Sequence, residues 1–311
     1  MINIQEIKET LKRGGSKLVY QSLDGLNWKQ LTFNDINSNL DYITSYLRTN
    51  NIKSKNILCC TKNCLDSFLL ESALSNLDSK IFFASTLTLQ TIEFNEEFDL
   101  IIIDHIDEIN MSPVLKKLSL SKEFITIQNF KKTKETGDKI KSLQNILKIG
   151  LLNKRDLDKK KNEFEFKLSQ TYKFASLEGL VDCTITDFAN QLDKIRNIFG
   201  SINVHDFSTS LYTEQDPFSK VLNFIFLLEG RKFSNNSSID SFIKNSNELM
   251  PKNIIIDAKN LVSMLNISDD NDKKLNELLG SKVERIITYE FDSDLYQNKI
   301  LQKFNLINYK R

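Results

Sequence analysis

The stretch Leu31-Thr-Phe-Asn-Asp-Ile-Asn37, which continues to Ile81-Phe-Phe-Ala-Ser-Thr86, decides the fold. Its first part carries apolar residues at intervals of three and four, which form one face of a helix: Ile36, Leu40, Ile43 and Leu47. Asn34 precedes this stripe and is of the residue type that caps a helix start. The pattern therefore predicts a long amphipathic helix that follows a short strand.

Alternating strands and helices are predicted on both sides of this helix. Asp24-Gly25 between two polar-apolar runs predicts a β-hairpin. Ile57-Leu-Cys-Cys60 and Lys80-Ile-Phe-Phe83 predict strands, with a helix through Phe68 to Leu74 between them. Phe98-Asp-Leu-Ile-Ile-Ile-Asp104 has the continuous apolar character of a buried parallel strand. Such units predict an α/β fold with a parallel or mixed sheet covered by helices.

Composition is that of an ordinary globular protein. The 311 residues are 40% hydrophobic and 27% charged, and 42 basic against 41 acidic side chains leave a net charge of +1. This balance gives no reason to expect nucleic acid or a membrane as a partner. We found no apolar run long enough for a membrane span and no signal-peptide core, so we expect a cytoplasmic protein.

The four cysteines are expected to be small buried hydrophobic residues rather than metal ligands. They are Cys59, Cys60, Cys64 and Cys183, and no two of them form a C-x-x-C pair. Glycine and proline are scarce, at 9 and 3 residues. A chain with so little glycine has few places for a phosphate-wrapping loop.

The second half continues with α/β patterns after a change in composition. Residues 131–162 are rich in lysine and are interpreted as a surface connection, in which Leu143, Ile146 and Leu147 predict one short helix. Lys159-Lys-Lys161 is interpreted as a solvated basic face. Glu163-Phe-Glu-Phe-Lys-Leu168 alternates as a half-buried strand does. A helix is expected through Phe188 to Phe199, capped by Thr186 or Asp187.

The sequence resembles the adenylate-forming (ANL) enzymes, which include acyl-CoA ligases and peptide-synthetase adenylation domains. The resemblance begins over about fifty residues that match the opening of the family: Trp28, Leu31-Thr-Phe33, Ile36, Leu47, Asn51-Ile52, Ile57, Asn63 and Ala73. Asp78 departs from it, since the family usually has glycine there. Leu227-Leu-Glu-Gly230, Pro251 to Leu265 and Gly280 to Ile287 match later segments. The resemblance implies two mixed sheets with helices packed between and outside them, as in the family's N-terminal domain.

The same resemblance implies a degenerate ATP site. The family cradles the ATP phosphates in a loop T-S-G-T-T-G-x-P-K-G-V, which corresponds here to Thr171-Tyr-Lys-Phe-Ala-Ser-Leu-Glu-Gly-Leu-Val181. Thr171 fits, but Lys173 and Ser176 replace glycines. Phe174 is bulky for a phosphate turn, and Gly179 stands at the position of the lysine. We therefore expect that ordinary ligase activity is lost.

Further expectations concern the pocket and the end of the chain. The acyl-channel wall of the family corresponds to four aromatic residues: Phe207, Tyr212, Phe224 and Phe226. Tyr309 would be a remnant of the adenine-contacting motif Y-G-x-T-E. We expect one adenylate-forming-like N-terminal domain over residues 1–311, with subdomains at about 1–130 and 163–311 joined by the lysine-rich connection. The C-terminal lid domain with its catalytic lysine is expected to be absent, so the chain is interpreted as truncated.

Two other groups of residues could suggest chemistry. Asp104-His-Ile-Asp-Glu108 gathers metal-ligand types after a buried strand, but neighbouring residues diverge in direction and we expect no metal site. His205-Asp206 near Ser208 and Ser210 could suggest a hydrolase triad. No G-x-S-x-G motif accompanies them, and adjacency in sequence is not triad geometry.

The leading hypothesis is a pseudoenzyme of the adenylate-forming type that acts in a biosynthetic pathway. It would bind an acyl or aryl carboxylate or a carrier-linked acyl group, or act as a scaffold for a protein partner or a second copy of itself. The alternative is an active acyl-activating or acyl-transferring enzyme with a rebuilt site, or half of a split ligase. No cofactor is expected under the first hypothesis, whereas ATP and magnesium are expected under the second.

Overall fold

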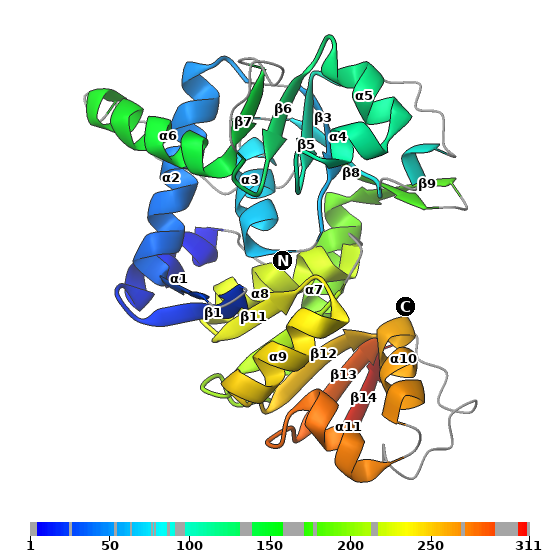
Figure 1. Ribbon diagram of the computed structural model, residues 1–311. Helices are drawn as coiled ribbons and strands as arrows, with labels where there is room; N and C mark the ends of the chain where they lie inside the picture. The colour runs from blue at the N-terminus through cyan, green and yellow to red at the C-terminus, as the bar shows by residue number, and fades with distance from the viewer. Residues whose placement is uncertain are drawn as a thin grey trace.

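The computed structural model describes residues 5–309 apart from 25–26, 53–54, 63, 76, 78, 86–87, 91–96, 131–138, 158–170, 177–178, 213–216, 269–270 and 290–303. Its described strands form two sheets of seven strands each. Figure 1 shows the first sheet above the second, with helices between them and on their outer sides. The sequence-based prediction of an α/β fold with two mixed sheets is confirmed.

The first sheet has the strand order β7-β6-β5-β3-β4-β8-β9. Its strands are β3 (Asn56–Cys60), β4 (Lys80–Phe83), β5 (Leu100–Ile103), β6 (Glu123–Thr126), β7 (Ile140–Ser142), β8 (Thr171–Ser176) and β9 (Gly179–Thr184). All neighbours are parallel except β8 and β9, which form an antiparallel hairpin. The sheet is therefore mixed only at one edge of its described part.

The second sheet has the order β14-β13-β12-β10-β11-β1-β2. Its strands are β1 (Leu18–Asp24), β2 (Asn27–Thr32), β10 (Ser208–Leu211), β11 (Phe233–Asn236), β12 (Asn253–Asp257), β13 (Arg285–Tyr289) and β14 (Asn305–Tyr309). The predicted hairpin is confirmed as β1 and β2, the one antiparallel pair among these strands. Each sheet takes strands from both sides of the lysine-rich segment. The expected subdomains at about 1–130 and 163–311 stay a prediction.

The helices cover the faces of the sheets. They are α1 (Gln5–Gly14), α2 (Phe33–Thr49), α3 (Leu65–Ser75), α4 (Glu108–Met111), α5 (Pro113–Ser119), α6 (Leu143–Leu157), α7 (Ile185–Phe199), α8 (Pro217–Glu229), α9 (Ile239–Leu249), α10 (Ala258–Ser268) and α11 (Asp272–Leu279), with a 3-10 turn at Thr88–Gln90. None of the helices in the described residues has both the length and the apolar character needed to cross a membrane.

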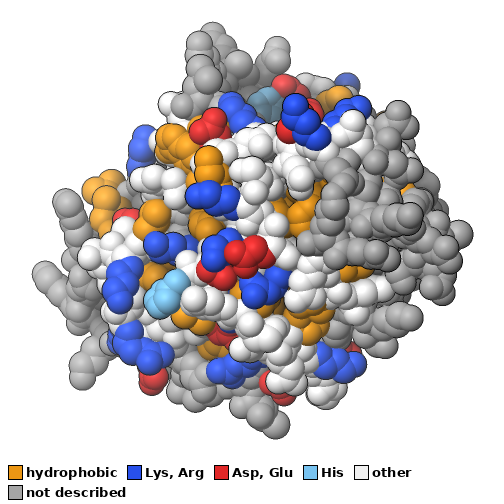
Figure 2. All heavy atoms as spheres, turned by 90° about the horizontal axis from the view of Figure 1, so that it is seen from below, with side chains coloured by type: hydrophobic (Ala, Val, Ile, Leu, Met, Phe, Trp, Pro, Cys, Tyr) orange, Lys and Arg blue, Asp and Glu red, His pale blue; other side chains and the backbone are white. Residues whose placement is uncertain are grey.

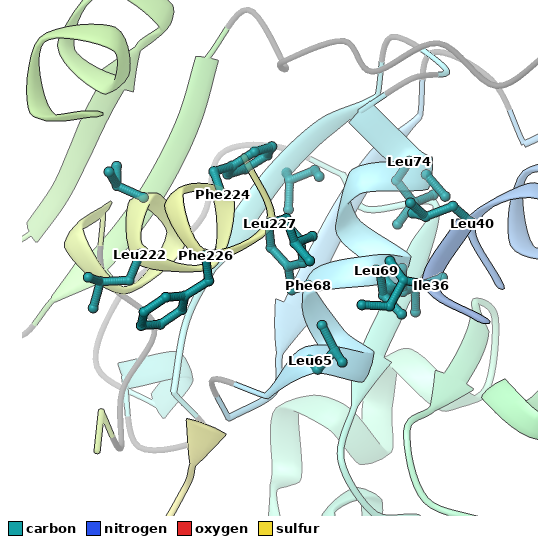
Figure 3. Packing of buried hydrophobic residues seen from close by; sticks show 14 of the residues in the cluster. Ile36, Leu40, Leu65, Phe68, Leu69, Leu74, Leu222, Phe224, Phe226 and Leu227 are labelled. Carbon is teal, nitrogen blue, oxygen red and sulfur yellow. The ribbon is translucent and has the colours of Figure 1, made fainter. Parts of the chain in front are cut away.

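Alternating strand residues divide the apolar core into three parts. In the first sheet, Cys59 belongs to a core shared by both sheets, whereas Cys60 faces α4 and α5 on the outer side. In the second sheet, Ile255 faces the shared core and Ile254 faces α9, α10 and α11. We call the shared part the interlayer core. In Figure 3, α3 lies between α8 and α2, with Leu69 and Leu74 directed toward α2.

The helix predicted within the lysine-rich segment is confirmed, but it is longer than expected and follows a strand. The structure describes residues 139–157 of it, which form β7 and α6. Ile140, Leu143 and Ile146 are buried. Gly150 allows α6 to approach α2 closely, because a Cβ atom there would lie 1.9 Å from the carbonyl oxygen of Tyr42. The expected strand at Glu163–Leu168 and the basic run Lys159–Lys161 lie outside the described residues.

Helix starts were predicted too late by two residues or more. The cap of α2 is Thr32, not Asn34, and it shares reciprocal hydrogen bonds with Asp35. The cap of α7 is Thr184, not Thr186 or Asp187, and it shares the same bonds with Asp187. The first helical residues are Phe33 and Ile185, which lie three residues before the apolar stripes used for the prediction. The stripes therefore mark the helix starts too late. The spacing T-x-x-D was the available signal.

Candidate functional site

The carboxyl edge of the second sheet is the place where an open α/β sheet normally holds a ligand. Asp257, Tyr289 and Tyr309 end three neighbouring parallel strands in one register. Tyr212 follows β10, whose last residue pairs with Ile256 of β12. This backbone register brings the predicted pocket residue Tyr212 and the predicted adenine-loop residue Tyr309 to the same edge.

At this edge, the side chain of Asp257 accepts hydrogen bonds at the start of α10. Its Oδ1 accepts the backbone N–H of Asn260 at 2.7 Å, and its Oδ2 accepts the Asn260 side-chain amide at 2.6 Å. A carboxylate that accepts two donors from the first turn of α10 is held by the helix terminus. Its described contacts therefore fix the geometry of the β12–α10 turn.

The predicted phosphate-loop residues lie in the β8–β9 hairpin. Thr171 and Ser176 pair with Thr184 and Gly179 at the two ends of the ladder. β8 also pairs with β4 at residues 172–174, so it has strand neighbours on both sides there. Two residues separate the last residue of β8 from the first of β9. The backbone of this motif is therefore largely committed to strand pairing.

Two side chains of the hairpin pack on the neighbouring strand β4. The ring of Phe174 is buried and stacks on the ring of Phe83, with centroids 4.8 Å apart. The Nζ atom of Lys173 lies 5.3 Å from the ring centroid of Phe82. Because successive strand residues point to opposite faces, Phe174 and Lys173 contact β4 on opposite faces of the sheet.

The structure does not bring the four predicted pocket-wall residues together. Phe207 precedes β10 and Tyr212 follows it, so they lie at opposite ends of this strand. Phe224 meets Phe68 of α3 edge to face at 4.8 Å. Phe226 contacts the rings of Phe199 and Phe233 instead. In Figure 3 Phe226 projects from the side of α8 away from Leu227 and α3. Their role as a wall remains a prediction.

A buried ion pair joins α3 to α8, and we did not predict it. Lys220 Nζ donates to Glu71 Oε2 in a very short contact, and each side chain is 5% exposed. Glu71 Oε1 also accepts from the hydroxyl of Ser67 and from the thiol of Cys59. Lys220 Nζ lies 4.3 Å from the ring centroid of Phe83. The available signal was a charged residue within the apolar stretch of each helix, Glu71 in α3 and Lys220 in α8, although the sequence does not show that the two meet.

The cysteines near this pair are unreactive in character. Burial raises the pKa of the Cys59 thiol far above its usual range, and the Glu71 carboxylate raises it further. Burial likewise raises the pKa of Cys64 to about 12. Cys59, Cys60 and Cys183 are buried and Cys64 is partly exposed, and all four are free thiols. Nucleophilic cysteine chemistry requires a lowered pKa, whereas burial raises the pKa of Cys59, Cys60 and Cys64.

The acidic residues after β5 accept hydrogen bonds from backbone N–H groups. Asp104 Oδ2 accepts the backbone N–H of Lys62 at 2.8 Å, and Glu108 Oε1 accepts that of His105 at 2.9 Å. Burial raises the pKa of Asp104 to about 7, and the nearby Glu108 adds to the rise. Within the described residues, His, Cys, Asp and Glu side chains form no group of three that could hold a metal ion.

The residues of the possible triad differ in solvent exposure. Ser208 and Ser210 are buried in β10, whereas His205 is exposed. Asp206 lies 3.5 Å from Lys252 and 3.8 Å from Arg285, and both cations also contact Glu284. These groups form an ion-pair network at the amino ends of β12 and β13. Figure 2 shows acidic and basic side chains interspersed on the described part of the lower face.

Comparisons with known proteins identify relatives by structure alone. No protein-family model and no curated protein matches the sequence. The adenylation domain of carboxylic acid reductase from Segniliparus rugosus, solved with AMP and a co-purified carboxylic acid, matches 99% of this chain with a TM-score of 0.72 and 11% identity. A long-chain-fatty-acid-CoA ligase from Archaeoglobus fulgidus matches 99% with a TM-score of 0.71 and 12% identity.

The similarity also extends to a luciferase-like enzyme and to an adenylation domain. A luciferase-like enzyme from the mealworm Zophobas morio matches 98% of this chain with a TM-score of 0.68 and 14% identity. An artificially fused adenylation–carrier di-domain from Klebsiella oxytoca matches 99% with a TM-score of 0.66 and 9% identity. The chain spans 59% of the reductase structure, 63% of the ligase structure and 71% of the luciferase-like structure.

Proposed function

We propose that this chain, which has the fold of the N-terminal domain of the adenylate-forming enzymes, binds an acyl or aryl group without activating it through ATP. The bound group would be a carboxylic acid or a carrier-linked acyl group in a biosynthetic pathway. A structural neighbour solved with a co-purified carboxylic acid, and one artificially fused to a carrier domain, support this class of ligand.

The β8–β9 hairpin carries the proposal that ATP chemistry is lost. A phosphate-binding loop must offer several free backbone N–H groups to the phosphate oxygens. Here the described residues that match the loop pair as strands, Thr171–Ser176 with Gly179–Thr184, and residues 177–178 lie outside the described part of the chain. An N–H group that is bonded within a sheet is not available to a ligand. Phe174, buried on Phe83, adds bulk where the resemblance implies close approach of the phosphates.

Isotope exchange between pyrophosphate and ATP tests the loss of activation. With magnesium and a panel of aliphatic and aryl carboxylic acids, we expect no exchange above that of a protein-free control. Carboxylate-dependent exchange would overturn the proposal and would establish the acyl-activating alternative. Calorimetry with ATP and magnesium provides a second readout, in which we expect no binding heat.

Ligand binding is tested separately from ATP chemistry. We expect calorimetric titration with aryl or medium-chain acyl compounds to show saturable binding. Absence of binding across acids and thioesters would leave the scaffold role, in which the chain acts by holding a protein partner or a second copy. Light scattering of the purified chain, alone and with carrier proteins, then tests that role.

A further inference from the structure

In the described part of the chain, the ammonium group of Lys220 is nearly closed to solvent and has more N–H donors than oxygen acceptors. An ammonium carries three N–H donors. In the described part of the chain Lys220 donates to one acceptor, Glu71 Oε2, while its side chain is 5% exposed. The face of Phe83 attracts the positive charge but supplies no oxygen lone pair. A buried donor without an acceptor is costly, so an incoming oxygen atom would be bound favourably.

The net charge of the Lys220–Glu71 pair determines which type of oxygen acceptor it would bind favourably. Lys220 and Glu71 together carry no net charge, and Glu71 already accepts from three groups. A second carboxylate would place two negative charges beside one positive charge at low exposure, which is unfavourable. A neutral carbonyl oxygen adds an acceptor without adding charge.

An aromatic pair lies one turn away on the same two helices. Phe224 follows Lys220 by four residues on α8, and Phe68 precedes Glu71 by three on α3. The two rings meet at 4.8 Å, so the helices run antiparallel where these two pairs face each other. A polar pair beside apolar rings matches a ligand with a carbonyl head and an apolar tail.

We propose that Lys220 and Glu71 form a recognition site for the carbonyl oxygen of a neutral acyl compound, such as a thioester, in preference to the free carboxylate. This inference rests on the proposed acyl-binding function and makes its ligand class specific. Lys220 is the hydrogen-bond donor, Glu71 balances its charge, and Phe68 and Phe224 contact the acyl tail. Because the pair is nearly closed to solvent, binding requires a small separation of α3 and α8.

The test compares three versions of one ligand. The probes are benzoyl and octanoyl thioesters of N-acetylcysteamine, the corresponding thioethers that lack the carbonyl oxygen, and the free acids. Calorimetry with the whole chain should show that a thioester binds at least about tenfold more tightly than its thioether or acid. Equal binding of thioester and thioether, or tighter binding of the acid, would overturn the inference.

Two variants separate recognition from stability. Lys220→Met with Glu71→Leu removes the pair without leaving a buried charge, and the thioester should then bind no better than the thioether. Glu71→Gln leaves the lysine uncompensated and should shift preference toward the free acid. The control pair Lys252→Met with Glu284→Gln alters the ion-pair network at the amino ends of the strands and should change neither preference. Circular dichroism verifies that each variant is folded.

Failure of the inference can be distinguished from failure of the proposed function. If the chain binds acids as well as thioesters, and the double variant retains this binding, acyl binding stands and the role of Lys220 is refuted. If the chain binds none of the probes, both the inference and the acyl-binding function are refuted. A carbonyl preference that persists in the double variant would also refute the role of Lys220.

Discussion

Lys220 and Glu71 carry opposite charges between two apolar helices, so each is costly to bury without the other. We predict that Lys220→Met alone lowers the unfolding free energy by about 3 to 5 kcal/mol, because it leaves a buried carboxylate unpaired. Lys220→Met with Glu71→Leu should cost much less, since both charges are removed. Urea unfolding of the parent chain and the two variants measures this difference. A double variant as unstable as the single one would contradict it.

The raised pKa of the Asp104 carboxyl group predicts that the unfolding free energy depends on pH. Burial raises its pKa from 3.8 to about 7, so between these values the folded chain binds more protons than the unfolded chain. The unfolding free energy therefore falls as the pH rises through this window, by up to about 1.4 kcal/mol per pH unit. Asp104→Asn should remove this contribution and become more stable than the parent at pH 8.

The control for Asp104 is a carboxyl group on the surface. Asp193→Asn changes an exposed residue of α7 and should leave the pH dependence of the parent chain unchanged. Urea unfolding at pH 4, 6 and 8 gives the difference between each variant and the parent. A parallel pH profile for Asp104→Asn and the parent would refute the assignment to Asp104.

At the scale of elements, α2 and α6 touch where Gly150 has no side chain. Alanine is normally better than glycine inside a helix by about 1 kcal/mol. Here the added Cβ would lie 1.9 Å from the Tyr42 carbonyl oxygen, so Gly150→Ala should instead destabilise the chain by about 1 to 3 kcal/mol. Gly200→Ala is the control, since its nearest neighbour would be 3.4 Å away. Thermal unfolding of the two variants should separate them.

The start of α2 offers a direct comparison of the observed cap with the predicted one. Thr32→Ala removes the side chain that accepts the Asp35 N–H and should cost about 1 kcal/mol. Asn34→Ala changes an exposed residue without a capping role and should be nearly neutral. Chemical denaturation of both variants decides between the two caps. A larger loss for Asn34→Ala would support the sequence-based cap.

Apolar periodicity predicted the elements that bury apolar residues, such as β5, β12 and α2. It could not predict β11, whose sequence Phe-Ser-Asn-Asn is buried but mostly polar. Side-chain hydrogen bonds to neighbouring elements satisfy that strand: Asn235 donates to Asn223 of α8 at 2.6 Å, and Asn236 donates to Thr209 of β10 at 2.8 Å. Such partners are distant in sequence, so no local pattern reveals them. The Lys220–Glu71 pair escaped prediction for the same reason.

For the whole molecule, the interlayer core contains residues from both sheets, including Ile57, Ile81, Ile255 and Ile287. Loss of either sheet would expose this core, so we predict that both sheets unfold in one cooperative transition. The single tryptophan, Trp28, lies in β2 and reports on the second sheet. Its fluorescence midpoint in urea should coincide with that of far-ultraviolet circular dichroism. Two separate midpoints would show that the sheets unfold independently.

The pairing of β1 with β11 also constrains how the chain is made. Tyr20 lies beside Phe233, so β1 must wait for a neighbour more than two hundred residues later in the chain. At ribosomal rates of about 5 to 20 residues per second, this delay is roughly 10 to 40 s. Throughout that time Val19 and Tyr20, which are buried in the finished fold, have no β11 to pack beside. We therefore expect β1 of a nascent chain to be exposed to aggregation for longer than a strand whose neighbours are close in sequence.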